Sequence, residues 1–324
     1  VVMEFGYTVP SRGSLAKPDV VSRLAKYGES VGFSILGASD HVVFPTNIDS
    51  TYPYSESGHI SRLGNGEILD PLILLTYIAG QTQSVKLLTS VMVVPHRPAV
   101  LAAKMISTIS FLSNSRFILG VGSGWLREEF EALQLPPFEE RGKVTDEYIE
   151  AFRELWAAEV ANFQGKYVQF SDVLFSPKPN DTESRNMPPI WVGGESPAAL
   201  RRVALHGDGW YPIGANPRFP MDSIERLGKA KETIMQNAER VNRDPSEIEY
   251  AYHVNWYSTE PIYESGTRKI FTGDTGLIAQ DLEMMNSIGF QKIIIDLSAQ
   301  SETEMTERIG KFSEDFKPFF ALNY

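Results

Sequence analysis

Two pairs of chemically active residues stand where strand-like runs of this sequence end. Asp40 and His41 close one β-branched and aromatic run, and His96 and Arg97 follow another, held between two prolines. An aspartate beside a histidine can act as an acid–base pair, as metal ligands or as a clamp on a cofactor. The first pair could instead cap a loop, and the second could open a helix. The position of Asp40 and His41 favours a functional role for this pair over a loop cap. For His96 and Arg97, a ligand-binding role and a helix start both stay open.

Two glycine-rich turns follow further apolar runs. One reads Gly120-Val121-Gly122-Ser123-Gly124-Trp125, and the other reads Gly193-Gly194-Glu195-Ser196-Pro197. Glycines let a flat ligand approach the backbone closely, although they also serve tight turns. A serine before a proline is an ordinary helix N-cap, but the free N–H groups of such a turn also bind phosphate. We expect the second turn to bind phosphate, and Trp125 either to line a pocket or to pack beneath the next helix.

Several other kinds of chemistry are excluded by composition and motif. The chain has no cysteine, which excludes disulfides, zinc–thiolate sites, iron–sulfur clusters and thiol nucleophiles. The first strand reads Tyr7-Thr8-Val9 and lacks the H-x-H pair of barrel metallohydrolases, and the strand ends offer few further ligands for a zinc ion. The sequence also has neither a G-x-S-x-G nucleophile motif nor a Walker loop. We therefore expect no metal site.

The charge balance indicates which partners the protein has. It carries 41 acidic and 30 basic residues, a net charge of −11. Such a surface repels nucleic acid and anionic lipid. No apolar run approaches the ~20 residues of a membrane helix, and the first residues lack a secretion-signal pattern. We expect a soluble, cytoplasmic protein that acts on a small molecule, with no nucleic-acid or membrane partner.

The elements that position these residues alternate between strand-like and helix-like periodicity. Eight strand–helix pairs over 324 residues predict one (β/α)8 TIM-barrel domain spanning residues 1–324. Polar insertions are expected after strands 2, 4 and 7, at residues 45–69, 162–187 and 257–274, with an added strand at Lys166–Phe170. The eight strand-like runs are Glu4–Val9, Phe33–Asp40, Val85–Val94, Arg116–Gly122, Ile190–Gly193, Gly209–Ile213, Ile248–Trp256 and Lys292–Leu297.

A doubly wound open sheet is the competing fold. Its dinucleotide motif would place G-x-G-x-x-G after the first strand, where this chain has Val9-Pro10-Ser11-Arg12-Gly13. In a barrel, by contrast, the active site lies at the C-terminal ends of the strands. The paired residues and both glycine-rich turns fall there, which favours the barrel.

Four segments of the chain resemble the luciferase-like flavin oxidoreductase superfamily, the barrel family of bacterial luciferase. They are Ser39–Pro45 (SDHVVFP), Phe117–Trp125 (FILGVGSGW), Phe138–Gly142 (FEERG) and Pro189–Arg202 (PIWVGGESPAALRR), and Gly207-Asp208-Gly209-Trp210 adds to them. In this order they resemble the branch whose members mostly use the deazaflavin coenzyme F420 instead of FMN. The resemblance covers nearly the whole chain and implies a homodimer.

The resemblance also implies roles for individual residues. Asp40 and His41 would approach the reactive face and the polar edge of a flavin-type ring, with His41 assisting transfer at ring C5. A non-proline cis peptide at Ser90-Val91 would support the back of the ring. Further cofactor contacts, including backbone N–H groups for the phosphate from the turn after strand five, would come from Gly122, Ser123, Val192, Gly193, Gly194 and Glu195.

Trp125 departs from one pattern of this family. Sugar-phosphate dehydrogenases of the family carry a catalytic glutamate at this position, so the chain lacks their proton donor. We therefore expect a hydrophobic or aromatic substrate, in a pocket that includes His96 and Trp125. The insertions at 45–69 and 257–274 are expected to act as lids over it.

Three functions remain open at this point. The favoured one is hydride transfer between F420 and a small hydrophobic substrate, with the ring chemistry belonging to the cofactor. The second is a two-component FMN-dependent monooxygenase, which uses oxygen and reduced FMN supplied by a separate flavin reductase. The third is a flavin-binding or storage protein without catalytic activity.

Overall fold

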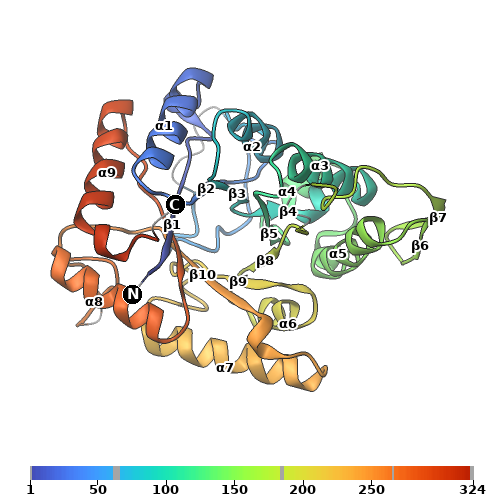
Figure 1. Cartoon of the computed structure of the whole chain (residues 1–324). Helices are drawn as coiled ribbons and strands as arrows, with labels where there is room; N and C mark the ends of the chain where they lie inside the picture. The colour runs from blue at the N-terminus through green and yellow to red at the C-terminus, as the bar shows by residue number, and fades with distance from the viewer. Residues whose placement is uncertain (1, 61–65, 183–185, 265, 322–324) are drawn as a thin grey trace.

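Eight parallel strands close into a barrel in the computed structural model, which describes residues 2–60, 66–182, 186–264 and 266–321 (Figure 1). Consecutive barrel strands pair along the chain, and closure follows because β1 also pairs with the last strand, β13. The predicted (β/α)8 barrel is therefore confirmed. The barrel strands are β1 (Glu4–Thr8), β2 (Ile35–Ala38), β3 (Lys86–Thr89), β5 (Phe117–Gly122), β8 (Ile190–Gly193), β9 (Gly209–Tyr211), β10 (Glu249–Val254) and β13 (Lys292–Ile295).

Helices surround the barrel and begin at recognisable capping residues. Proline is the first residue of α1, α2 and α6, where its missing N–H is not needed. Asp70, Ser196 and Asp274 accept hydrogen bonds from the first-turn N–H groups of α2, α6 and α8. The helices are α1 (Pro18–Ser30), α2 (Pro71–Ala79), α3 (Ala99–Leu112), α4 (Arg127–Ala132), α5 (Arg141–Ala157), α6 (Pro197–His206), α7 (Ile224–Arg240), α8 (Thr275–Ser287) and α9 (Glu302–Asp315).

Side chains alternate between the inside of the barrel and the helix layer, as strand geometry requires. A small inner cluster takes one residue from each of seven strands and packs against Val91. The larger cluster fills the space between the strands and the helices. The inner cluster closes the middle of the barrel and consists of Ile35, Leu88, Ile118, Trp191, Tyr211, Ala251 and Ile294.

The third predicted strand is interrupted. β3 ends at Thr89, the Ser90–Val91 peptide bond is cis, and the chain resumes pairing with β5 as β4 (Met92–Val93). The cis peptide lies at the position that the family resemblance implied. The continuous strand predicted over 85–94 is therefore wrong, because the chain turns out of the ladder at Ser90.

An antiparallel hairpin after α5 replaces the single added strand predicted at Lys166–Phe170. It consists of β6 (Ala161–Gln164) and β7 (Gln169–Val173) and projects from the barrel beside α5 (Figure 1). The Glu147 carboxylate on α5 accepts the N–H groups of Lys166, Tyr167 and Val168, so residues predicted as strand form the turn. This contact spans about twenty positions, which the local pattern does not reveal.

Two other long segments join the barrel strands to their helices. Residues 39–70 separate β2 from α2, and residues 255–274 separate β10 from α8 and contain the short hairpin β11 (Tyr263–Glu264) and β12 (Thr267–Arg268). The predicted insertion at 45–69 includes residues 61–65, which lie outside the described residues. Within the described part of the chain, each helix is too short or too polar to cross a membrane.

Candidate functional site

The C-terminal ends of the eight strands, with the residues directly after them, form what we call the barrel mouth. His41 enters it after β2 and is held by a carboxylate from a different part of the chain. Its Nδ1 lies 2.7 Å from Oε2 of Glu129 on α4. Oε1 of Glu129 accepts the N–H groups of Val42 and Val43, at 2.6 and 3.2 Å. The carboxylate therefore fixes both the His41 ring and the backbone that follows it.

Glu129 is fully buried, and its neighbours decide its charge. Burial by itself raises the pKa of this carboxyl. The hydrogen bond from His41, the proximity of the His96 and His41 rings and the N–H of Val42 outweigh burial, so the pKa of Glu129 lies below its ordinary value. The ionised carboxylate accepts the Nδ1 proton of His41, which leaves Nε2 as the free ring nitrogen. Nε2 hydrogen-bonds no other residue in the described ranges.

Two aromatic rings lie beside His41, and further rings pack against one of them. The rings of Phe44 and Trp125 lie 4.5 and 6.0 Å from the His41 ring, centroid to centroid. Tyr52 packs edge-on against Trp125 at 5.1 Å and contacts Tyr54 at 5.8 Å. Burial raises the pKa of both tyrosines. The predicted pocket residue Trp125 thus lies beside His41, and the loop after β2 adds three more aromatic side chains.

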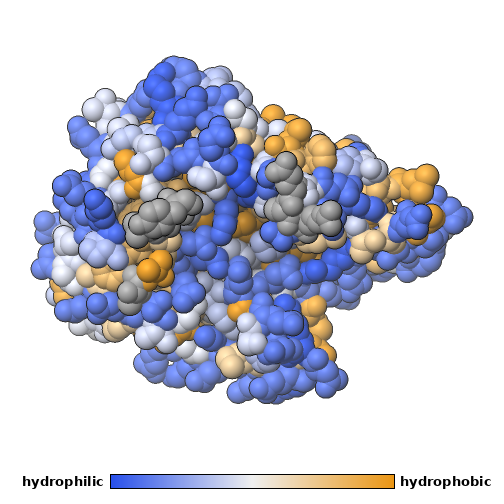
Figure 2. All heavy atoms as spheres, in the orientation of Figure 1, coloured by the Kyte–Doolittle hydropathy of each residue, from blue (hydrophilic) through white to orange (hydrophobic). Residues whose placement is uncertain are grey.

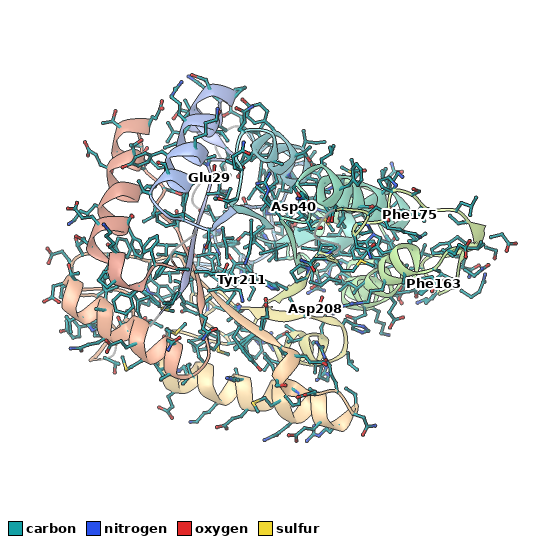
Figure 3. The ribbon with its side chains drawn as sticks, viewed as in Figure 1. Glu29, Asp40, Phe163, Phe175, Asp208 and Tyr211 are labelled. Atoms are coloured by element: carbon teal, nitrogen blue, oxygen red, sulfur yellow. The ribbon has the colours of Figure 1, made fainter. Side chains whose placement is uncertain are left out.

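Asp40 lies next to His41 in sequence but is engaged elsewhere. Its carboxylate forms a two-pronged ion pair with Arg97, at 2.8 and 2.9 Å, and accepts the N–H of Val93. Arg97 also reaches Asp70, the N-cap of α2, at 2.6 Å. Burial alone would lower the pKa of Arg97, but the two carboxylates raise it. Asp40 therefore ties the loop after β2 to the chain after β4. Figure 3 labels Asp40 and Tyr211.

The cis peptide lies against three glycines in the mouth. A Cβ at Gly122 would lie 2.8 Å from Cγ2 of Val91, and one at Gly193 would lie 3.1 Å from its Cγ1. On the other side, a Cβ at Gly37 would lie 3.3 Å from that of Ser90. The sequence placed four of these residues at the cofactor site, and the structure brings them together around Val91. We call this surface the glycine floor.

The turn between β8 and α6 has the geometry predicted for it. Gly194 has a φ of +97°, a left-handed conformation that suits glycine. Trp210 supports the turn from β9, since its indole N–H donates to the carbonyl of Gly194 at 3.0 Å. Ser196 caps α6 by accepting the N–H of Ala199. No acceptor within the described ranges binds the N–H of Gly194 or Ser196, which leaves both available to an anion.

Glu195 faces away from these N–H groups. Its carboxylate accepts the N–H of Ile213 at 2.9 Å and the side-chain amide of Asn216 at 3.0 Å. Burial raises the pKa of Glu195 to about 7, against the effect of those two donors. Glu195 thus anchors the loop after β9 to the turn after β8.

Three further predicted site residues lie outside the glycine floor. His96 is buried behind Glu129, with Nε2 3.7 Å from Oε2 of that residue and the ring against Phe130. Both ring nitrogens of His96 lack hydrogen bonds, and burial lowers its pKa. The side chain of Val192 packs in the outer core, so it can offer only backbone to the mouth. Ser123 directly follows β5 and is half-buried.

The opposite wall of the mouth carries polar residues that the sequence analysis did not select. Tyr211 ends β9, His253 lies on β10 and Asp296 follows β13. The strand-end rule could have found Asp296, since it stands directly after an apolar run. For Glu129 the sequence offers no local signal, because it lies in a charged helix 88 positions from His41.

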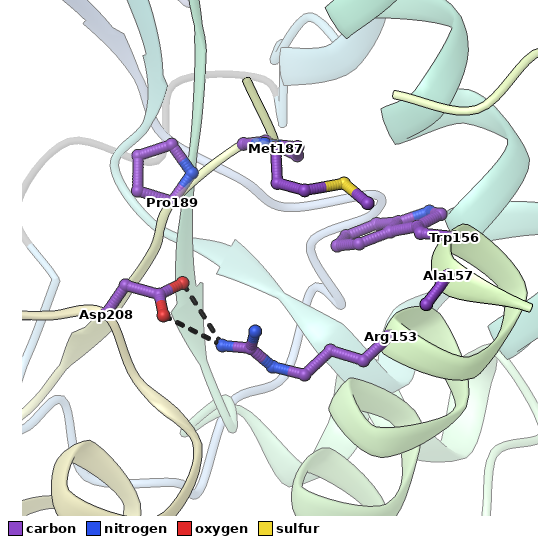
Figure 4. Close-up of a pocket in the computed structure, with 7 residues that line it drawn as sticks. Arg153, Trp156, Ala157, Met187, Pro189 and Asp208 are labelled. Atoms are coloured by element: carbon purple, nitrogen blue, oxygen red, sulfur yellow. Dashed lines mark hydrogen bonds and ion pairs between the residues drawn. The ribbon is translucent and has the colours of Figure 1, made fainter. Parts of the chain in front are cut away.

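A cavity at the other end of the barrel does not belong to this site. It has a volume of about 300 Å³ and lies between the C-terminal part of α5 and the residues before β8 and β9. Arg153 and Asp208 form an ion pair of 3.0 Å across it, as Figure 4 shows. Asp208 also accepts the N–H of Ile190, which explains this pair as an anchor for β8. Among the described residues, no group of three or more potential metal ligands is found.

The structure thus combines a closed (β/α)8 barrel with a histidine–carboxylate pair at its glycine-rich mouth. The sequence profile of the luciferase-like monooxygenases matches residues 3–264. The chain therefore belongs to the luciferase-like monooxygenase family, an enzyme superfamily of flavin-dependent oxidoreductases and monooxygenases. An uncharacterised protein of Mycobacterium tuberculosis is 32% identical over 204 residues, which are 63% of this chain and 67% of that protein.

Solved structures with this fold include proteins that bind either kind of cofactor. An F420-dependent secondary alcohol dehydrogenase, in complex with an F420–acetone adduct, is similar with a TM-score of 0.75 and 16% identity, over 98% of this chain and 99% of that one. A riboflavin lyase with modified FMN is similar with a TM-score of 0.74 and 13% identity, over the whole of this chain and 94% of that one. These likenesses establish the fold and leave the choice of cofactor open.

Proposed function

We propose that this protein transfers hydride between coenzyme F420 and a small, hydrophobic alcohol or carbonyl compound. The observation that carries the proposal is His41 at the barrel mouth, whose Nδ1 is held by Glu129 while its Nε2 bonds no other described residue. A histidine fixed in one tautomer by a buried carboxylate is suited to general acid–base work. Phe44 and Trp125 beside His41, with Tyr52 packed on Trp125, favour an apolar substrate.

A flavin-type ring fits the residues present. In the glycine floor the glycines leave room around the Val91 side chain, and an added Cβ at Gly122 would lie 2.8 Å from that side chain. The N–H groups of Gly194 and Ser196 at the start of α6 suit a phosphate group. F420, when bound there, supplies a ring carbon that accepts or donates hydride.

The residues of the chain handle the proton that accompanies the hydride. When a substrate alcohol is oxidised, its carbon loses a hydride and its hydroxyl proton passes to Nε2 of His41. In the reverse direction Nε2 returns that proton to the carbonyl oxygen. Glu129 stabilises the positive charge that His41 carries between the two steps. The surrounding aromatic side chains exclude water from the exchange.

The first experiment is a paired fluorescence titration of the protein, without cofactor, with F420 and with FMN in one buffer. Tighter binding of F420 supports the proposal, and binding of neither ring refutes it. Turnover of F420 with a panel of secondary alcohols and ketones then tests the reaction. His41→Ala should lower kcat by about two orders of magnitude while F420 affinity stays nearly unchanged. Unchanged turnover in this variant would remove His41 from the mechanism.

An FMN-dependent monooxygenase is the second candidate. The aromatic enclosure of His41 favours it as well, because such enzymes must shield reduced flavin chemistry from water. Preferential binding of reduced FMN, with substrate oxygenation once a flavin reductase is added, would support this candidate. A flavin-storage protein would bind a flavin ring but turn over none of these substrates.

We also propose that the protein forms a homodimer, which the outer face of α2 and α3 supports. Leu69, Ile73 and Tyr77 are exposed at four-residue spacing, and α3 beside them exposes Leu101 and Phe111. Figure 2 shows hydrophobic surface at the edge where Figure 1 places α2 and α3. An apolar stripe across two neighbouring helices is typical of a surface that a second subunit covers.

A further inference from the structure

His96 is a buried histidine that the proposed reaction does not use. It ends the short 3₁₀ turn η2 (Val94–His96) after β4, and its side chain is only 1% exposed. Both of its ring nitrogens lack a hydrogen-bond partner among the described residues. Unpaired polar atoms in a protein interior cost stability, and a catalytic site is one place where folds retain them.

The charged atom that faces this ring already belongs to the proposed site. Nε2 of His96 lies 3.7 Å from Oε2 of Glu129, the same oxygen that lies 2.7 Å from Nδ1 of His41. The other carboxylate oxygen, Oε1, accepts the N–H groups of Val42 and Val43. Because a carboxylate oxygen can accept two hydrogen bonds, Oε2 has capacity for both imidazole rings. Glu129 thus links a histidine in the mouth to a histidine behind it.

The position of His96 is fixed by residues on both sides of it. The Asp40 carboxylate accepts the N–H of Val93, three residues earlier, and the guanidinium of Arg97, the next residue. Phe130 packs edge-on against the His96 ring, with centroids 5.3 Å apart. The ring is therefore held beside Glu129 by the backbone and by packing, without help from its own nitrogens.

His96 is uncharged at neutral pH. Burial lowers its pKa below the ordinary value, against the opposing effect of the Glu129 carboxylate. The other charged or titratable groups that face the ring are Asp40, His41 and Arg97. The neutral ring carries one proton, and the field of the carboxylate favours that proton on Nε2, the nitrogen nearest to it. A neutral donor stabilises the carboxylate without cancelling its charge.

We propose that His96 is a positioning residue for the proton transfer, which donates from Nε2 to Oε2 of Glu129 and so keeps this carboxylate ionised and directed at His41. A shift of roughly 1 Å brings the 3.7 Å separation to hydrogen-bond length. This inference deepens the proposed function and rests on it, since that function gives His41 the proton. A carboxylate that accepts a second N–H attracts the protonated His41 less strongly. His96 therefore makes His41 release its Nε2 proton more readily.

Burial favours this indirect role over contact with the substrate. The side chain of His96 is 1% exposed, against 12% for His41, and the charged atom nearest to it is Oε2 of Glu129. His96 thus acts on the reaction through Glu129, and its removal should change the proton transfer more than the KM for substrate.

The test follows the His41 ring by ¹⁵N NMR in the protein without cofactor, and kcat for F420-dependent alcohol oxidation across pH. His96→Phe keeps a ring against Phe130 but removes the donor. We expect the midpoint of the His41 titration and the acidic limb of kcat to rise together by about 0.5–1 pH unit. His96→Gln retains an N–H donor and should restore both. His206→Phe is the matched control, since Nδ1 of His206 lies 3.8 Å from Oε1 of Glu150, outside the mouth, and should change neither.

The possible results lead to distinct conclusions. An unchanged midpoint in His96→Phe would overturn the inference, and so would an equal shift in His96→Gln, because packing would then be the cause. The wild-type protein gives a test that needs no variant, since a ring proton found on Nδ1 of His96 would also overturn it. Absence of F420 turnover together with the expected NMR shifts would overturn the proposed function alone, because those shifts require neither cofactor nor substrate.

Discussion

The Nδ1 atom of His41 lies 2.7 Å from Oε2 of Glu129, and this contact joins two residues 88 positions apart in the chain. One comes from the loop after β2 and the other from a short helix after β5. Since the same carboxylate also accepts the N–H groups of Val42 and Val43, it orients the whole segment that carries His41. Glu129 lies outside the Ser39–Pro45 motif, yet it positions His41 within that motif.

Replacing Glu129 by glutamine should slow the reaction without unfolding the protein. The amide retains an oxygen for the N–H of Val42 but cannot stabilise a protonated His41. We expect kcat to fall about 10- to 100-fold, with the KM for substrate nearly unchanged. Steady-state kinetics together with the pH profile of kcat test this. A variant with normal kcat at every pH would show that Glu129 only supports the loop.

Replacing Arg97 by methionine should mainly affect stability. Asp40 would lose its two-pronged partner and leave a buried, unpaired carboxylate. The free energy of unfolding should fall by about 3 kcal/mol, and Asp40→Asn should cost less because its side chain is uncharged. Urea unfolding followed by circular dichroism measures both. A greater loss of stability in Asp40→Asn than in Arg97→Met would contradict this account.

Adding one methyl group to the glycine floor should impair cofactor binding. In Gly122→Ala the new Cβ would lie 2.8 Å from Val91 and push that side chain toward the ring position. We expect at least a tenfold loss of cofactor affinity in fluorescence titrations. Gly228→Ala on α7 is the matched control, since no atom lies within 4 Å of its added Cβ. That helix substitution should leave affinity unchanged and stabilise the fold by about 0.5–1 kcal/mol.

Glu195 should make the stability of the protein fall as pH rises. Burial raises its folded-state pKa to about 7, above the ordinary value of 4.5. Between these values the folded chain retains a proton that the unfolded chain has lost, so the free energy of unfolding decreases with pH. The difference in stability between Glu195→Gln and the wild type should shift in favour of the variant by about 2–3 kcal/mol from pH 4.5 to pH 7.5. Urea midpoints across this range test it, and a constant difference would contradict the assignment.

A charge on the exposed face of α3 should separate the proposed homodimer. Leu101 is 53% exposed on this face, and aspartate there would place a charge in an apolar interface. We expect light scattering to give about twice the 36.2 kDa chain mass for the wild type and the single mass for Leu101→Asp. Val241→Asp, at an exposed apolar position at the end of α7, should remain dimeric. A monomeric wild type would exclude the dimer.

The sequence by itself determined the barrel and the location of its functional end. Alternating periodicities and continuously apolar runs specify parallel strands covered by helices, because both signals depend only on neighbouring positions. The same local reasoning found Gly193 and Gly194, whose turn needs a residue without a side chain. The family resemblance added the cis peptide at Ser90–Val91, which no periodicity indicates.

Only the tertiary structure decided which side chains meet in the mouth. Asp40 and His41 are adjacent in sequence, yet one pairs with Arg97 and the other with Glu129. One wall of the mouth is formed by Tyr211, His253 and Asp296, which come from three strands that are far apart along the chain. A closed barrel brings the ends of all its strands to one rim whatever their separation in sequence. Which side chains contact each other across that rim depends on their distances and burial in the folded protein. The linear sequence pattern contains neither kind of information.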